Sequence, residues 1–111
     1  TDLLICDWSS IAFDFLALER PTIFLDVPHP FKNGFSLGPE FRFGAVVEDI
    51  PSLGDSLADF LRRPENYLAK FRQGHLDTLQ EVYGSNTDGL SARRQWQHLS
   101  LILANRTGKP D

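Results

Sequence analysis

The sequence predicts an α/β fold in which part of a doubly wound, Rossmann-like parallel sheet is followed by a helical region. Residues 3–6 and 22–25 form short continuous apolar runs, which are typical of strands buried in a parallel sheet. An apolar segment of helical length, 10–19, separates them, as expected for a strand–helix–strand unit. Further along the chain, apolar residues recur at spacings of three and four, the period of an amphipathic helix. We therefore divide the chain into an α/β core at 1–50 and a helical region at 51–111.

The helix predicted at 10–19 is apolar nearly all round, so we expect it to be buried, with Phe13, Phe15 and Leu16 in the core. It ends at Arg20-Pro21, because the residue before a proline is pushed out of the helical region of backbone conformation. The strands on either side of this helix should be parallel neighbours.

The segment 27–44 predicts an irregular connection. It is rich in proline and glycine and carries four phenylalanines, Phe31, Phe35, Phe41 and Phe43. Loops of this length in compact domains are usually functional or disordered. We expect it to be the most mobile part of the chain outside the termini, unless its rings dock on the core. A third strand is predicted at Ala45–Val47, with 48–51 as its exit turn.

Three helices are predicted after that turn, at 55–63, at 64–83 and from about residue 91 onward. Pro64 suits the first turn of a helix, and Gly84 suits the position just after one. The apolar stripe of the second helix is Leu68, Phe71, His75, Leu79 and Val82, and that of the third is Ala92, Trp96, Leu99, Ile102 and Leu103.

Composition excludes several classes of function. A net charge of −4 argues against a nucleic-acid partner, since such domains usually carry a basic stripe. No apolar run approaches the ~20 residues of a membrane span. Cys6 lies inside an apolar run and is interpreted as a small buried residue. The three histidines lack metal-ligand spacing, so no metal site is expected. Because the chain starts inside a strand and without Met, we expect it to be a piece of a longer protein.

Asp7, Ser9 and Ser10 lie between the first strand and the following helix. Ligands of open α/β sheets bind at the carboxyl ends of strands, and a helix amino terminus attracts anions. These residues therefore predict a phosphate or diphosphate cradle, with Asp7 holding a hydroxyl or orienting Ser9. The alternative is purely structural, because serine is also a common N-cap residue.

Two further acids are candidates. Asp14 is the only charge in its apolar helix, and such a group either stabilises the positive helix end or needs a polar partner. Asp88, followed by Gly89, precedes the last helix, where a turn with a Ser91 cap would explain the pattern equally well.

Three motifs together resemble the CDP-glycerol glycerophosphotransferase family. They are Asp7-x-Ser9-Ser10-x-x-x-Asp14, Leu18-x-Arg20-Pro21-x-Ile23-Phe24, and Asp88-Gly89 ahead of a helix. The resemblance is strong over 1–26, weak over 27–60 and moderate over 84–94. It implies the nucleotide-binding C-terminal lobe of a two-lobed, GT-B type transferase that makes teichoic-acid and capsular polysaccharides of the cell wall.

The resemblance also implies site residues and partners. The paired serines would contact the diphosphate of a CDP-glycerol-like donor, Asp7 and Asp14 would belong to that site, and Asp88 would approach it from the other side. No cofactor is implied. The partners would be the donor, a polymer acceptor and the N-terminal lobe of the same protein, which would carry the catalytic histidines upstream of Thr1. The fragment alone would be inactive, and its parent would be cytoplasmic, peripheral at the inner face of the bacterial membrane.

The family usually has tyrosine or another aromatic residue at position 8, and Trp8 is a tolerable change. The chain departs from the family across 26–44, which leaves acceptor specificity open. Two other functions also stay open. One is a GT-B glycosyltransferase that uses a nucleotide-sugar. The other is a receiver-like, non-catalytic interaction module with Asp7 as phosphate acceptor, although the further acids and the lysine of such modules are not found.

Overall fold

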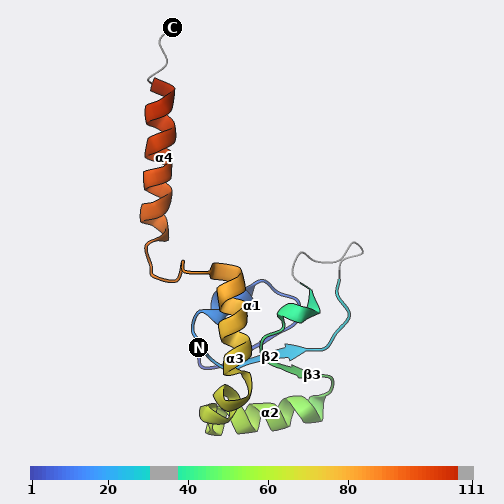
Figure 1. Cartoon of the computed structure of the whole chain (residues 1–111). Coiled ribbons are helices and arrows are strands. Elements are labelled where there is room, and N and C mark those ends of the chain that lie inside the picture. The colour runs from blue at the N-terminus through green and yellow to red at the C-terminus, as the bar shows by residue number, and fades with distance from the viewer. Residues whose placement is uncertain (31–37, 108–111) are drawn as a thin grey trace.

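The computed structural model describes residues 1–30 and 38–107, and this part of the chain forms a three-stranded parallel sheet with four α-helices (Figure 1). The predicted α/β class and the parallel pairing of the first two strands are confirmed. The elements in chain order are β1 (Leu4–Cys6), α1 (Ile11–Leu16), β2 (Thr22–Leu25), the short 3-10 helix η1 (Pro39–Phe41), β3 (Ala45–Val47), α2 (Ile50–Arg62), α3 (Pro64–Tyr83) and α4 (Ser91–Thr107).

The sheet has the order β1-β2-β3, so β2 lies between the other two strands. Thr22, Ile23 and Phe24 of β2 are accordingly all buried. In the outer strands the alternate residues Ile5 and Val46 are 41% and 46% exposed. The expectation that 3–6 is buried on both faces is therefore wrong at Ile5, because β1 is an outer strand of the described sheet.

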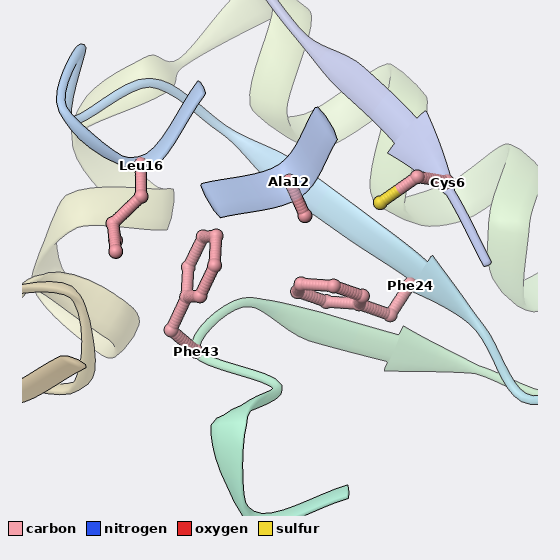
Figure 2. Close-up of a cluster of buried hydrophobic side chains, with 5 residues drawn as sticks. All are labelled: Cys6, Ala12, Leu16, Phe24 and Phe43. Carbon is pink, nitrogen blue, oxygen red and sulfur yellow. The ribbon is translucent and has the colours of Figure 1, made fainter. Parts of the chain in front are cut away.

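One face of the sheet is covered by α1. Figure 2 shows Ala12 and Leu16 of this helix in one cluster with Cys6 and Phe24 of the sheet and the ring of Phe43. Burial of Phe15 and Leu16 is confirmed, and Phe13 is half-buried.

The expectation of a helix over 10–19 that is buried all round is wrong. The helix α1 has only six residues, and turns formed by Leu18 and Glu19 follow it. Ile11 is more than half exposed, because only one side of this short helix meets the sheet, and Leu18 is more than half exposed in the turn beyond the helix.

The other face is covered by α2. Ile23, Ala45 and Val47 pack there with Phe60 of α2 and Tyr67 of α3. The helix α2 begins at Ile50, five residues earlier than predicted, so the expected exit turn at 48–51 is wrong in its second half. The reason is local: the Asp49 carboxylate accepts a hydrogen bond from Ser52 N at 2.7 Å, and a proline occupies the first turn.

The helix α3 has its predicted bounds and runs past the amino-terminal edge of the sheet. Tyr67, near its start, is buried with the residues of one face, whereas Leu79 and Tyr83, near its end, pack against those of the other. The fit at this edge is close: a Cβ on Gly44, next to β3, would lie 2.2 Å from the Thr22 carbonyl oxygen. Residues of α3 therefore pack along the amino-terminal edge of the sheet, opposite the carboxyl-terminal edge where the candidate site lies.

The helix α4 begins at Ser91, as predicted, and projects from the rest of the molecule (Figure 1). The radius of gyration is consequently 19.2 Å, against about 13 Å for a compact chain of this length. Trp96, Leu99 and Ile102 of its apolar stripe are exposed. Within 1–30 and 38–107, no helix is both long and apolar enough to cross a membrane.

The segment 27–44 is irregular where it is described, apart from η1. Phe43 docks in the core and Phe41 is half-buried. Phe31 and Phe35 lie outside the described residues. The mobility expected for this segment stays a prediction.

Candidate functional site

The candidate site lies where the strands end at their carboxyl termini. Asp7 and Trp8 directly follow β1, and Ser9 and Ser10 precede α1, as the sequence predicted. The side chains of Asp7, Ser9 and Ser10 are exposed. In open α/β sheets, ligands bind in the crevice outside the carboxyl ends of the strands.

The two serines do little for the helix that follows them. Ser10, at the N-cap position, has helical backbone angles, and its side chain makes no capping hydrogen bond within the described structure. The Ser9 hydroxyl oxygen accepts a hydrogen bond from Ile11 N at the long distance of 3.4 Å. Helix capping therefore uses little of the hydrogen-bonding capacity of these two hydroxyl groups.

Trp8 ties the turn after β1 to the exit of β2. Its indole Nε1 donates a hydrogen bond to the Val27 carbonyl oxygen at 2.7 Å. The His29 ring stands edge-on to it, with 6.0 Å between ring centroids. The Arg42 guanidinium carbon lies 4.0 Å from the centre of the Trp8 ring, within cation–π range.

Arg42 is the residue of this site that sequence reasoning missed. Its side chain is only 9% exposed, and its Nη1 donates to Asp26 Oδ1 at 2.8 Å. Together with Asp7, Trp8 and Ser9 it lines a small cavity of about 20 Å³. The signal that could have found it is the single charge in the run Phe41-Arg42-Phe43, because a cation between two apolar rings needs a polar partner.

A second and larger cavity, of about 230 Å³, lies at the carboxyl ends of β2 and β3. Its lining includes Leu25, Val47 and Leu53, with the carboxylates of Asp26 and Asp49. Hydrogen bonds from Ser52 hold the pKa of the Asp49 carboxyl below its usual value. Because Asp26 also pairs with Arg42, one ion pair connects the two cavities.

Asp14 is exposed on α1, one turn beyond the serines. The prediction that a charge in this helix needs a partner presumed a buried helix. The exposure of Asp14 removes that requirement, because water solvates the carboxylate.

Asp88 is occupied by its own neighbours. One of its oxygens accepts from Leu90 N at 2.9 Å, and the other pairs with Arg94 Nη1 at 2.8 Å. The Arg94 hydrogen bond is the largest cause that lowers the pKa of Asp88. The structure thus brings Asp7, Ser9 and Arg42 to one cavity, whereas the recorded partners of Asp88 all lie within six residues of it.

Cys6 beneath the site is not an activated nucleophile. Burial, with the nearby charge of Asp7, raises the pKa of its thiol to about 11, so the reactive thiolate is scarce at neutral pH. The interpretation of Cys6 as a buried structural residue is confirmed. Among residues 1–30 and 38–107, no three His, Cys, Asp or Glu side chains are grouped as metal ligands would be.

Comparison with known families identifies the chain. Residues 1–99 match the family described as CDP-glycerol:poly(glycerophosphate) glycerophosphotransferase, and the chain belongs to this family. The resemblance seen in the three motifs is thereby confirmed. Neither a curated protein nor a solved structure matches the chain.

Proposed function

We propose that this member of the glycerophosphotransferase family binds the nucleotide end of a CDP-activated polyol at the carboxyl edge of its sheet. The observation that carries the proposal is the family match over residues 1–99. The whole protein would then transfer glycerol phosphate, or a similar polyol phosphate, to a cell-wall or capsular polymer. In this proposal the chain is the donor-binding part of the C-terminal lobe of a GT-B type enzyme.

The geometry of the edge supports this assignment. Asp7, Ser9 and Arg42 converge on the small cavity, and hydroxyl and guanidinium groups are suited to phosphate oxygens. The larger cavity is lined by apolar residues together with Asp26, Glu48 and Asp49, a lining that suits a nucleoside. Its volume of about 230 Å³ lies below the roughly 300–1,000 Å³ of complete ligand pockets. We therefore expect the isolated chain to bind the donor weakly.

The reaction that we propose for the whole protein is a phosphoryl transfer. An acceptor hydroxyl oxygen attacks the phosphorus that carries the polyol, and a new P–O bond forms. The bond from that phosphorus to the bridging oxygen breaks, and CMP leaves with the electron pair. In this proposal the hydroxyl proton passes to a histidine of the N-terminal lobe, which acts as the base. The donor site would contribute by positioning the diphosphate and stabilising its developing charge.

Each predicted site residue has a proposed hydrogen-bonding role toward the donor. Ser9 and Ser10 would donate hydrogen bonds to the diphosphate, while Asp7 and Asp14 would accept them from hydroxyls of the donor. Asp88 would join the site only if its bond with Arg94 opens. The N-terminal lobe of the same protein would cover the exposed stripe of α4 that includes Trp96.

Binding of free nucleotides tests the donor site directly. We expect CDP to bind the chain more tightly than UDP in calorimetry, and replacement of both Ser9 and Ser10 by Ala to weaken CDP binding about tenfold, as for the loss of charge-assisted hydrogen bonds. Ser100→Ala is the matched control, because this serine bonds to Trp96 O on α4. Unchanged CDP affinity in the double variant would contradict the assignment of the serines.

The same assay separates the alternatives. Tighter binding of UDP than of CDP would favour a nucleotide-sugar glycosyltransferase. Stable phosphorylation of Asp7 by acetyl phosphate, without nucleotide binding, would favour a receiver-like module. In the full-length enzyme, the double serine variant should raise the CDP-glycerol concentration needed for half-maximal rate and lower the turnover.

The contact proposed for α4 has its own test. Leu99→Glu should lower the activity or solubility of the full-length protein, because it places a charge in an apolar interface. It should leave the stability of the isolated chain unchanged, since Leu99 is 52% exposed there. Full activity of this variant would argue against the contact.

A further inference from the structure

Arg42 carries hydrogen-bonding capacity that its surroundings do not use. Its Nη1 donates to Asp26, and the Trp8 ring stacks on the guanidinium plane. Its Nε and Nη2, by contrast, are buried and have no hydrogen-bond partner among the described residues. Buried polar groups are almost always paired, and leaving a charged donor unpaired is costly. Two unpaired nitrogens on one buried side chain therefore call for an explanation.

The two unused nitrogens form one edge of the guanidinium. Nε–H and Nη2–H point in the same direction, and this edge binds two oxygens of one phosphate or carboxylate in parallel. Asp26 occupies a nitrogen outside the edge, so the ion pair leaves the edge complete. The cavity beside Arg42, of about 20 Å³, holds about one water. A phosphate would need this cavity to widen.

We propose that Arg42 is a phosphate-binding residue of the donor site, and that its Nε–Nη2 edge takes two oxygens of one phosphoryl group. This inference rests on the proposed function, because it takes the phosphorylated donor to be the ligand at this edge of the sheet. Asp26 and Trp8 act as positioning residues: the first holds Nη1, and the second supports the guanidinium plane through its own bond to Val27.

A purely structural arginine would behave differently on substitution. Lysine at position 42 keeps the positive charge, can pair with Asp26 and can lie over the Trp8 ring. It lacks the planar fork that binds two oxygens at once. Arg42→Lys therefore removes the proposed function of the residue while it keeps the contacts that hold the loop.

The test measures binding of four probes, CDP, CMP, inorganic phosphate and cytidine, to the wild-type chain and to Arg42→Lys. We expect the variant to lose at least tenfold in affinity for CDP and CMP and to weaken phosphate binding. Its affinity for cytidine, which has no phosphate, should equal that of the wild type. Arg20→Lys is the matched control, because Arg20 contacts Thr1 and Asp2, away from the cavity. It should change none of the four affinities.

A second measurement does not depend on the variant folding. In the wild-type chain, the Nε–H resonance of Arg42, assigned through its bonded nuclei, should shift when CDP or phosphate is added and stay in place with cytidine. Equal CDP affinity in wild type and Arg42→Lys, equal losses for CDP and cytidine, or an unmoved resonance at saturating CDP would overturn the inference.

The outcomes separate this inference from the function on which it rests. CDP binding that is insensitive to Arg42→Lys leaves the donor site in place and removes Arg42 from it. Arg42-dependent binding of inorganic phosphate without any preference for cytidine nucleotides keeps the phosphate site and rejects the CDP donor. Failure of the wild type to bind any of the phosphorylated probes rejects both.

Discussion

The two ends of the sheet bury polar side chains of different charge. At the amino-terminal edge, Tyr67 Oη and His75 Nε2 share a hydrogen bond of 2.5 Å, and the Phe43 ring packs against His75. Both residues are at most 1% exposed, and burial favours their neutral forms. His75 Nδ1 is buried without a hydrogen-bond partner among the described residues. At the carboxyl-terminal edge, the Arg42 side chain is 9% exposed and charged, and two of its nitrogens have no hydrogen-bond partner among the described residues.

This difference indicates that one edge of the sheet stabilises the fold and that the other is suited to binding a ligand. A neutral, hydrogen-bonded pair packed among aromatic rings stabilises the fold and offers little to a ligand. A charged group beside exposed hydroxyls and carboxylates can bind an anion. We therefore expect substitutions at the amino-terminal edge to change stability and those at the carboxyl-terminal edge to change binding.

The largest effect on stability is expected for Gly44→Ala. The added methyl group would lie 2.2 Å from Thr22 O and 2.8 Å from Tyr67 Oη, and the backbone oxygen cannot move aside cheaply. We expect a loss of about 3 kcal/mol in the free energy of unfolding, typical of severe overpacking, in urea denaturation. Gly54→Ala is the control: its methyl group meets nothing within 4 Å, and it should stabilise α2 by about 0.5–1 kcal/mol. Equal effects of the two changes would show that the edge is loosely packed.

Tyr67→Phe should cost about 2 kcal/mol, because it leaves His75 Nε2 buried without its partner. Tyr83→Phe provides the comparison. Tyr83 donates to Phe13 O at 2.9 Å from a half-buried position, so the same deletion should cost only about 1 kcal/mol. Thermal unfolding of both variants measures the difference, and a larger loss for Tyr83→Phe would contradict the greater importance of the Tyr67–His75 pair.

The pair should also make stability depend on pH. Burial lowers the pKa of His75 in the folded state, so below pH 6.5 the unfolded chain binds a proton that the folded chain does not. Stability should therefore fall as the pH drops through 6.5 toward the lower folded pKa, by at most about 1.4 kcal/mol per pH unit. At the alkaline end, burial raises the pKa of Tyr67 to about 12, so stability should fall from pH 10 upward.

The midpoints of urea denaturation, measured across these pH ranges, check both the acid-side and the alkaline-side loss of stability. His98→Gln, on the exposed helix α4, should still lose stability below pH 6.5 as the wild type does. Replacement of His75 should reduce this loss. An unchanged loss of stability below pH 6.5 in the His75 variant would assign the effect to other groups.

The smallest effects on stability are expected at the carboxyl-terminal edge. Asp7→Asn and the Ser9, Ser10 double alanine variant change exposed side chains, so the free energy of unfolding should stay within about 0.5 kcal/mol of the wild type. Urea denaturation gives this value. A loss of more than about 1 kcal/mol would make these residues structural and weaken the contrast between the edges.

Much of the fold could be predicted because the strands carry strong local signals. The bounds of β2 and β3 and those of α3 were right, since each is a continuous apolar run or a long periodic segment with proline and glycine at its ends. Errors occurred at 10–19 and at 48–51. There, the outcome depended on how much of a short helix meets the sheet and on one Asp49–Ser52 hydrogen bond, which composition does not reveal.

The candidate site could be predicted only in part. Asp7, Ser9 and Ser10 could be placed at a strand end because they are adjacent in sequence. Arg42 was missed because its partners, Asp26 and Trp8, are 16 and 34 positions away and meet it only after folding. Asp7, Ser9, Ser10, Asp14 and Asp88 all stay predictions as ligand-binding residues.

Hydrogen–deuterium exchange of the chain with and without saturating CDP tests the central claim most directly, because it reports on both edges in one experiment. We predict that CDP slows exchange at residues 7–13 and 38–43 around the small cavity. The amides of 67–75 on α3 should exchange equally with and without CDP. Protection confined to α3, or no protection at the carboxyl-terminal edge, would contradict the proposal that this edge binds the donor.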